Sequence, residues 1–115
     1  MQVKISVRHG QLSDPARQMI RDKAQKLLHY FERLTFIDVT VDLHEDARSV
    51  EVLATAEHKH EFVARETNGE LQVALDMALD KVVHQIRRYK EKIQDHRRTP
   101  PVGGEAAAPP AAGRP

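Results

Sequence analysis

Cysteine is absent from this sequence of 115 residues. That absence excludes a thiol nucleophile, a cysteine zinc finger and the disulfide framework of small secreted domains. Hydrophobic runs are also short, and none approaches the ~20 residues with which a helix spans a bilayer. The first residues alternate apolar and polar side chains, whereas a signal peptide has a continuous apolar stretch. We therefore expect a soluble cytoplasmic protein without a membrane partner, and its length predicts one domain.

Glycine and proline are scarce, and most of them lie at one end. Three of the five glycines and five of the six prolines follow residue 98, beside an alanine-rich run. Such a segment cannot bury enough apolar surface to offset the entropy lost on ordering. The composition predicts a folded domain over residues 1–98 and a disordered tail over residues 99–115.

The motifs of common enzymes are missing as well. The three serines, Ser6, Ser13 and Ser49, do not lie in a glycine elbow, and there is no glycine-rich phosphate loop. Asp76 and Asp80 lie one helical turn apart, which is more typical of a solvated helix flank than of a catalytic pair. We expect a protein that is not an enzyme and that uses no cofactor and no small-molecule substrate.

Hydrophobic periodicity predicts six elements in the order β-α-β-β-β-α. Alternating apolar residues predict four strands, at residues 3–7, 37–44, 50–56 and, more weakly, from Phe62 to about 67–69. Apolar residues spaced by three and four predict helices over 14–33 and 70–96, the first capped by Ser13 or Asp14. The economical packing is an α+β fold of two layers, with a four-stranded sheet and both helices on one face.

The net charge of +1 hides an uneven distribution. Residues 1–34 carry seven basic and three acidic side chains, residues 35–70 carry three and nine, and residues 71–98 carry seven and four. The predicted helices are therefore basic and the central strands acidic. Phosphate groups are the natural partners of such helices, and the acidic strands would turn them toward a nucleic acid.

The basic side chains line up on the outer faces of both predicted helices. The candidate phosphate-binding residues are Lys23, Lys26, Arg33, Lys81, His84, Arg87, Arg88, Lys90 and Lys92. If the helices lie side by side, these faces form one basic ridge. The alternative is a solvated helix surface with local ion pairs.

Histidine is frequent, with seven residues. His58 and His60 lie on one side of an extended segment and could hold a metal weakly. Because no third ligand has a fixed spacing from them, we expect no metal site.

Several segments together resemble a known family. They are Met1–Ile5, Arg17, Lys23–Leu27, Tyr30-Phe31, Arg33, Ala74–Asp76, Asp80–Val82, Gln85-Ile86 and Arg88–Lys92. At this spacing the chain resembles the short form of the ribosome hibernation-promoting factors, also called ribosome-associated inhibitors or ribosomal subunit interface proteins. The resemblance covers residues 1 to about 96. Two positions depart from the family pattern, since Gln72 replaces a tyrosine and His84 an arginine.

The resemblance implies a β-α-β-β-β-α fold and a specific role. Family members bind rRNA of the small ribosomal subunit in the channel used by messenger and transfer RNA. They inhibit translation under stress or in stationary phase and stabilise inactive 70S ribosomes. The basic candidates, His84 and Arg87 apart, match basic positions of the family. Residues 99–115 are too short for the second domain with which long members pair ribosomes, so pairing would need a separate small dimerising partner.

Two other functions remain open from the residues alone. A general double-stranded RNA-binding module would use the same basic faces away from the ribosome. A protein-interaction domain would instead dock a partner on the acidic strands.

Overall fold

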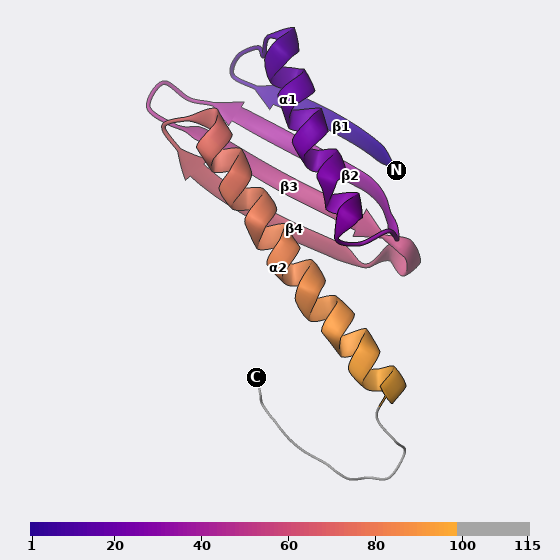
Figure 1. Cartoon of the computed structure of the whole chain (residues 1–115). Coiled ribbons are helices and arrows are strands. Elements are labelled where there is room, and N and C mark those ends of the chain that lie inside the picture. Colours follow the sequence, from indigo (N-terminus) through magenta and orange to yellow (C-terminus); the bar gives the residue numbers. More distant parts are fainter. Residues whose placement is uncertain (99–115) are drawn as a thin grey trace.

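The computed structural model describes residues 1–98, and their side chains as far as residue 93 (Figure 1). The elements are β1 (Gln2–Arg8), α1 (Asp14–Gln25), η1 (Lys26–His29), β2 (Leu34–Leu43), β3 (Arg48–Ala56), η2 (Glu57–Lys59), β4 (Glu61–Asn68) and α2 (Leu71–Arg98), with η marking short 3₁₀ helices. The predicted tail lies outside the described residues.

The four strands form one sheet in the order β1-β2-β3-β4. β1 pairs with β2 in parallel, and the other two pairs are antiparallel. A parallel pair needs a crossover connection, which α1 and η1 supply here. α1 crosses the same face of the sheet as α2, with α1 over β1 and β2 and α2 over β3 and β4 (Figure 1). The predicted two-layer architecture is confirmed.

The core fills the space between the sheet and the helices. Strand residues alternate between the two faces, so β2 and β3 bury one side chain in two against the helices. The fully buried large side chains are Ile20, Leu27, Ile37, Val39, Val41, Val50, Val52, Phe62, Leu75, Val82 and Ile86. The opposite sheet face, which no described helix covers, is called the open face below.

The first helix ends earlier than predicted. The α-helix stops at Gln25 and continues as η1, so the predicted helix over 14–33 is too long. The amides of Tyr30 and Phe31 both donate to the carbonyl of Leu27, which tightens this last turn. The turn keeps Leu27 and Phe31 buried while the chain reverses into β2. Because these two residues are four apart, as on one face of an α-helix, the sequence pattern predicted that the helix continued.

Side-chain oxygens accept from backbone amides at or just before both helix starts. Ser13 Oγ accepts from the amide of Ala16 at 3.2 Å, with a proline in the first turn as predicted. Asn68 Oδ1 accepts from the amide of Glu70 at 3.0 Å, at the entry to α2. Neither of the described α-helices has the length and apolarity needed to cross a membrane.

Candidate nucleic-acid interface

The candidate basic residues lie on the helices and at their ends, away from the open face. Eight of the nine are exposed, and Lys23 is half-buried. Lys23 is on α1, Lys26 is on η1, and Arg33 lies just before β2. The other six lie on α2 between residues 81 and 92. Seven of them form two groups, on opposite flanks of α2, and Lys26 and Arg33 belong to neither group.

The first group lies at the seam between α1 and α2. Lys23 Nζ on α1 bonds Asp76 Oδ1 on α2 at 2.8 Å. Lys90 Nζ donates to the carbonyl oxygen of Tyr30 at 2.8 Å, and the Arg87 guanidinium lies 5.8 Å from the centre of the Tyr30 ring. These contacts tie α2 to the end of the first helical segment.

The second group lies on the flank of α2 that faces β4. Lys81 forms an ion pair with Glu66 of β4. One turn further on, Gln85 bonds the backbone amide and carbonyl of Val63, at 3.1 and 2.7 Å. At 100° per residue, Arg88 and Lys92 continue the line of Lys81, with His84 close beside it. Among the described residues, Arg88 and Lys92 have no ion-pair partner.

An aromatic cluster supports α2 beneath these basic residues. Tyr89 packs edge-on against Phe31 and Phe62, with ring centres 5.7 and 5.5 Å apart. The ring of His60 stacks on Tyr89 at 4.1 Å. His60 therefore packs against α2. The cluster holds the basic stretch of α2 against the chain after η1 and against β4.

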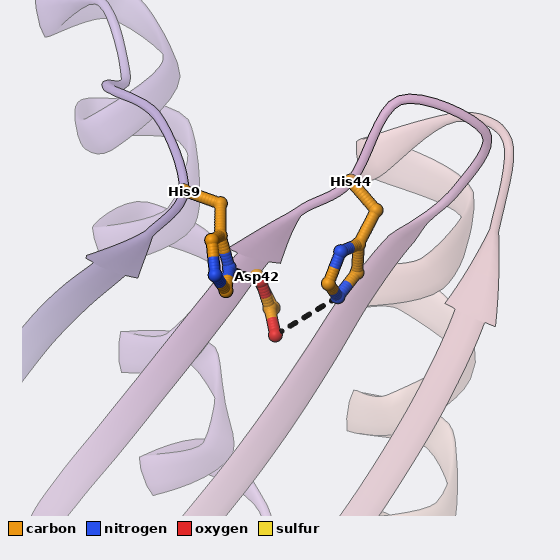
Figure 2. Close-up of side chains that lie close together, drawn as sticks. All are labelled: His9, Asp42 and His44. Atoms are coloured by element: carbon orange, nitrogen blue, oxygen red, sulfur yellow. Dashed lines mark hydrogen bonds and ion pairs between the residues drawn. The ribbon is translucent and has the colours of Figure 1, made fainter.

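The structure brings together three polar residues that the sequence pattern did not connect. His9 follows β1, Asp42 is on β2, and His44 follows β2 (Figure 2). His9 Nδ1 donates to Asp42 Oδ1 at 2.6 Å, and His44 Nε2 to Asp42 Oδ2 at 3.1 Å. The hydrogen bond from His9, followed by the nearby His44, lowers the pKa of the Asp42 carboxyl below its ordinary value against the opposing effect of desolvation.

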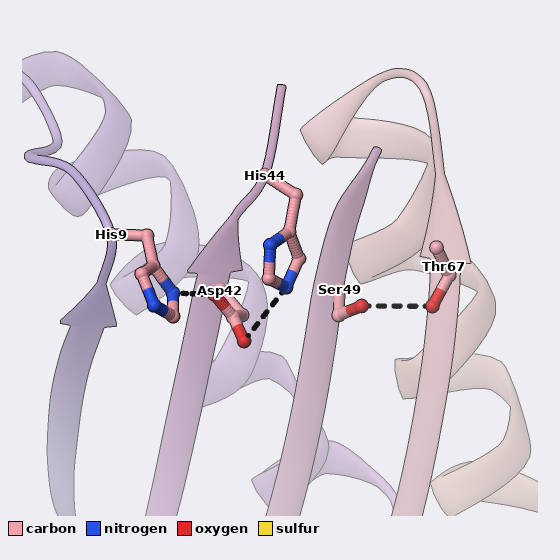
Figure 3. A network of polar contacts seen from close by, with 5 residues as sticks. All are labelled: His9, Asp42, His44, Ser49 and Thr67. Atoms are coloured by element: carbon pink, nitrogen blue, oxygen red, sulfur yellow. Dashed lines mark hydrogen bonds and ion pairs between the residues drawn. The ribbon is translucent and has the colours of Figure 1, made fainter. Parts of the chain in front are cut away.

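A row of polar residues continues from this cluster across the open face. Arg8 lies opposite Asp42, Asp42 opposite Ser49, and Ser49 opposite Thr67. Ser49 and Thr67 share a hydrogen bond of 2.9 Å (Figure 3). Only the strand register brings His9 beside Asp42, which is 33 residues away, so no sequence spacing could have found this group.

Comparison with known proteins assigns the chain to a family. The sequence model of the family described as sigma 54 modulation protein / S30EA ribosomal protein matches residues 3–94. The chain belongs to this family. The match covers the four strands from residue 3 on, α1, and α2 as far as residue 94, and it includes all nine basic candidates.

The S30EA family relatives include several ribosome hibernation promoting factors. The chain is 28% identical to the one from Pseudomonas putida over 94 residues, which cover 82% of this chain and 91% of the relative. It is 27% identical to the one from Azotobacter vinelandii, over 80% and 85% of the two chains. It is 22% identical to the one from Escherichia coli K12, over 84% and 100%.

Two solved structures share the fold. A ribosomal subunit interface protein from Coxiella burnetii has a TM-score of 0.68 at 15% identity, over 79% of this chain and 99% of the other. The N-terminal domain of Thermus thermophilus Protein Y has a TM-score of 0.69 at 21% identity, over 77% and 99%. The resemblance stated from the sequence is confirmed at the level of family and fold.

Proposed function

We propose that this protein is a ribosome hibernation factor, which binds ribosomes and holds them in an inactive state under stress or in stationary phase. The observation that carries the proposal is membership of the S30EA family over residues 3–94. The relatives reported above are named ribosome hibernation promoting factors, and this chain spans at least 85% of each of them. Binding to ribosomes implies a cytoplasmic location.

The proposed contact is between the basic helix surface and rRNA of the small subunit, in the channel for messenger and transfer RNA. Its residues are the nine basic candidates, seven of which lie in the two flank groups. Lysine and arginine side chains bind phosphate oxygens and release condensed counterions, so they hold a folded domain in an RNA-lined channel without reading bases. Occlusion of that channel inhibits translation and needs no catalytic group.

The basic candidates differ in whether a carboxylate already pairs with them. Lys23 and Lys81 already have carboxylate partners, whereas Arg88 and Lys92 have none among the described residues. We therefore expect Arg88 and Lys92 to contribute more to phosphate binding than the paired lysines. Neither the general double-stranded RNA-binding module nor the protein-interaction domain is favoured once the relatives are known.

The decisive experiment is sedimentation of ribosomes from starved cells on a sucrose gradient, with immunoblotting for this protein. We expect the protein in small-subunit, 70S or paired-ribosome fractions, and its loss from them at high salt. Recovery only at the top of the gradient at low salt would contradict the proposal. A protein that also binds free duplex RNA as tightly as subunits would instead be a general RNA-binding module.

A matched pair of variants distinguishes the effect of the α2 flank from the effect of net charge. Arg88→Glu/Lys92→Glu and Lys4→Glu/Arg65→Glu change the net charge equally, but the second pair lies exposed on the open face. We expect the first variant to leave the ribosomal fractions and the second to remain. Equal losses from both would show that overall charge, rather than the flank of α2, governs association.

A further inference from the structure

The cluster of His9, Asp42 and His44 lies on the open face, at the edge where β1 and β2 end (Figure 2). The three residues offer two imidazole nitrogens and a carboxylate oxygen, all within 4.8 Å of one another. We propose that they form a binding site for a divalent transition-metal ion of the zinc class. This inference does not rest on the proposed ribosomal function.

The donor set suits such an ion. Imidazole is a preferred ligand of zinc, copper, nickel and iron, and a carboxylate oxygen completes a mixed nitrogen and oxygen set. Calcium and magnesium prefer all-oxygen ligands, so two histidines select against them. Three protein ligands leave one position of a tetrahedral ion for water.

The distances fit with small side-chain movements. Zinc lies about 2.0–2.1 Å from a histidine nitrogen and about 2.0–2.2 Å from a carboxylate oxygen, so two ligands of a tetrahedral ion are about 3.3 Å apart. The His44–Asp42 separation is 3.1 Å, close to that value, whereas the His9–Asp42 separation is 2.6 Å. Both histidines are more than half exposed, at 64% and 52%, so their rings can turn outward to admit an ion.

The fold fixes the carboxylate and leaves the imidazoles free to adjust. Asp42 is only 17% exposed and sits on a strand that is paired on both sides. Its two oxygens point toward different histidines (Figure 3). A carboxylate held in place between two movable rings is a preorganised anchor for a cation.

Gly10, which follows His9, lies close to the end of β2. A Cβ atom at Gly10 would lie 2.8 Å from Cδ1 of Leu43, so the Leu43 side chain would have to shift to admit it. The absence of a side chain at Gly10 lets the loop after β1 pack against Leu43 without that shift.

The surrounding charge is mixed. A shallow hollow beside Asp42 is lined by Arg8, Thr40, Ser49, Glu51 and Arg65. The charges of the two arginines are offset by those of Asp42 and Glu51, so the surface beside the cluster does not repel a cation. The basic flank groups lie on the helix side of the sheet, and metal binding and RNA binding therefore use different surfaces.

Calorimetric titration of the full chain with ZnCl₂ tests the proposal. We expect saturable binding of one ion, and His9→Gln/His44→Gln should lower the affinity by about 100-fold or more, because even groups that merely orient metal ligands are worth 10–100-fold. The matched control is His29→Gln/His58→Gln, which removes two other exposed imidazoles. This control should bind as the wild type does.

A second measurement keeps the test decisive if the double variant does not fold. In ¹H–¹⁵N spectra of the wild-type imidazoles, Zn²⁺ should shift the His9 and His44 resonances before any others. Asp42→Asn should remove this order of response. Absence of saturable binding up to millimolar Zn²⁺ would overturn the proposal, as would equal affinity in the His9/His44 variant or first shifts at other histidines.

Discussion

Basic residues that look equivalent in the sequence differ in what they already bind. Lys81 and Arg88 lie on the same flank of α2, but Lys81 is paired with Glu66 of β4. Part of its attraction for phosphate is therefore cancelled inside the protein. A carboxylate at the edge of a phosphate-binding surface also repels the RNA directly.

Removal of that carboxylate should strengthen binding. Glu66→Gln releases Lys81 and deletes one negative charge beside the flank that carries Arg88. We expect ribosome association to persist to higher salt than in the wild type, at a cost of about 0–1 kcal/mol in stability, since Lys81 is more than half exposed and ion pairs open to solvent contribute little. Gradients run at stepped KCl concentrations measure this.

The corresponding change at the seam is Asp76→Asn, which releases Lys23. If the β4 flank faces the RNA, Glu66→Gln gives the larger gain in salt resistance. A larger gain from Asp76→Asn would place the seam against the ribosome instead.

Asp42 predicts a pH dependence of stability. Its carboxyl has a lowered pKa in the folded protein, chiefly through the hydrogen bond from His9. The corresponding stabilisation is present above the unfolded pKa of about 3.9 and is lost as pH falls through the lower folded value. With EDTA present to remove any bound metal, we expect Asp42→Asn to have a lower free energy of unfolding than the wild type at pH 5–7. This difference should shrink below about pH 4. Urea unfolding at each pH tests this, and a difference independent of pH would contradict it.

At the scale of elements, the turn between β3 and β4 holds two successive residues in the left-handed region. His58 and Lys59 have φ values of 66° and 63°. The backbone amide of Ala56 donates to the carbonyl oxygen of His60 at 2.8 Å, which closes the turn. Two successive residues with positive φ are characteristic of a type I′ hairpin turn, which favours asparagine followed by glycine. Side chains with a Cβ atom pay about 1–2 kcal/mol each in this region.

Lys59→Gly should therefore stabilise the protein. We expect a gain of about 1 kcal/mol, corresponding to a rise in melting temperature of roughly 4–8 °C for a domain of this size. Lys59→Ala keeps the Cβ atom while removing the charge, so it serves as the control and should leave the melting temperature nearly unchanged. A similar rise in both variants would assign the effect to charge rather than to backbone strain.

The same scale shows how far sequence reasoning reaches. Alternation and helical spacing identified every strand and both helices, because burial imposes those periods directly on the residues. The boundary of α1 was missed because Leu27 and Phe31 stay buried through a tighter turn, so the apolar spacing continues beyond the helix. His9 and Asp42 meet only through the parallel register, which periodicity does not encode.

The sequence likewise could not predict which basic residues lie on which flank of α2. The helical repeat aligns Lys81, Arg88 and Lys92 with one another. The repeat does not show whether this row of residues faces β4 or α1. The ion pairs to β4 and to α1 show it, because they depend on how the helices pack on the sheet.

At the scale of the whole molecule, the basic candidates share one layer. They lie on the helix side of the sheet, whereas the open face mixes Asp42 and Glu51 with Arg8 and Arg65. The resulting field should orient the protein before contact, with its helices toward RNA. Association should then fall steeply with ionic strength.

The salt dependence of binding reports the number of phosphate contacts. Each neutralised phosphate contributes about 0.7–0.9 to the slope of log K against log salt. If Arg88 and Lys92 each contact one phosphate, Arg88→Ala/Lys92→Ala should reduce the slope by about 1.4–1.8. Filter binding of purified small subunits at several salt concentrations measures it. An unchanged slope would mean that neither residue touches a phosphate.

The long second helix has a consequence for how order is distributed along the chain. α2 has 28 residues, about 42 Å at 1.5 Å each, and β4 beneath it has eight, about 27 Å. α2 therefore runs on past the sheet, as Figure 1 shows. Backbone amides of α2 up to Lys90, whose side chain still bonds Tyr30, should exchange with deuterium only when the whole domain unfolds, whereas those beyond it can exchange by local fraying. Lys92 lies beyond this contact, so docking would have to order its turn, and part of the binding energy would appear as slowed exchange at the end of α2 rather than as affinity.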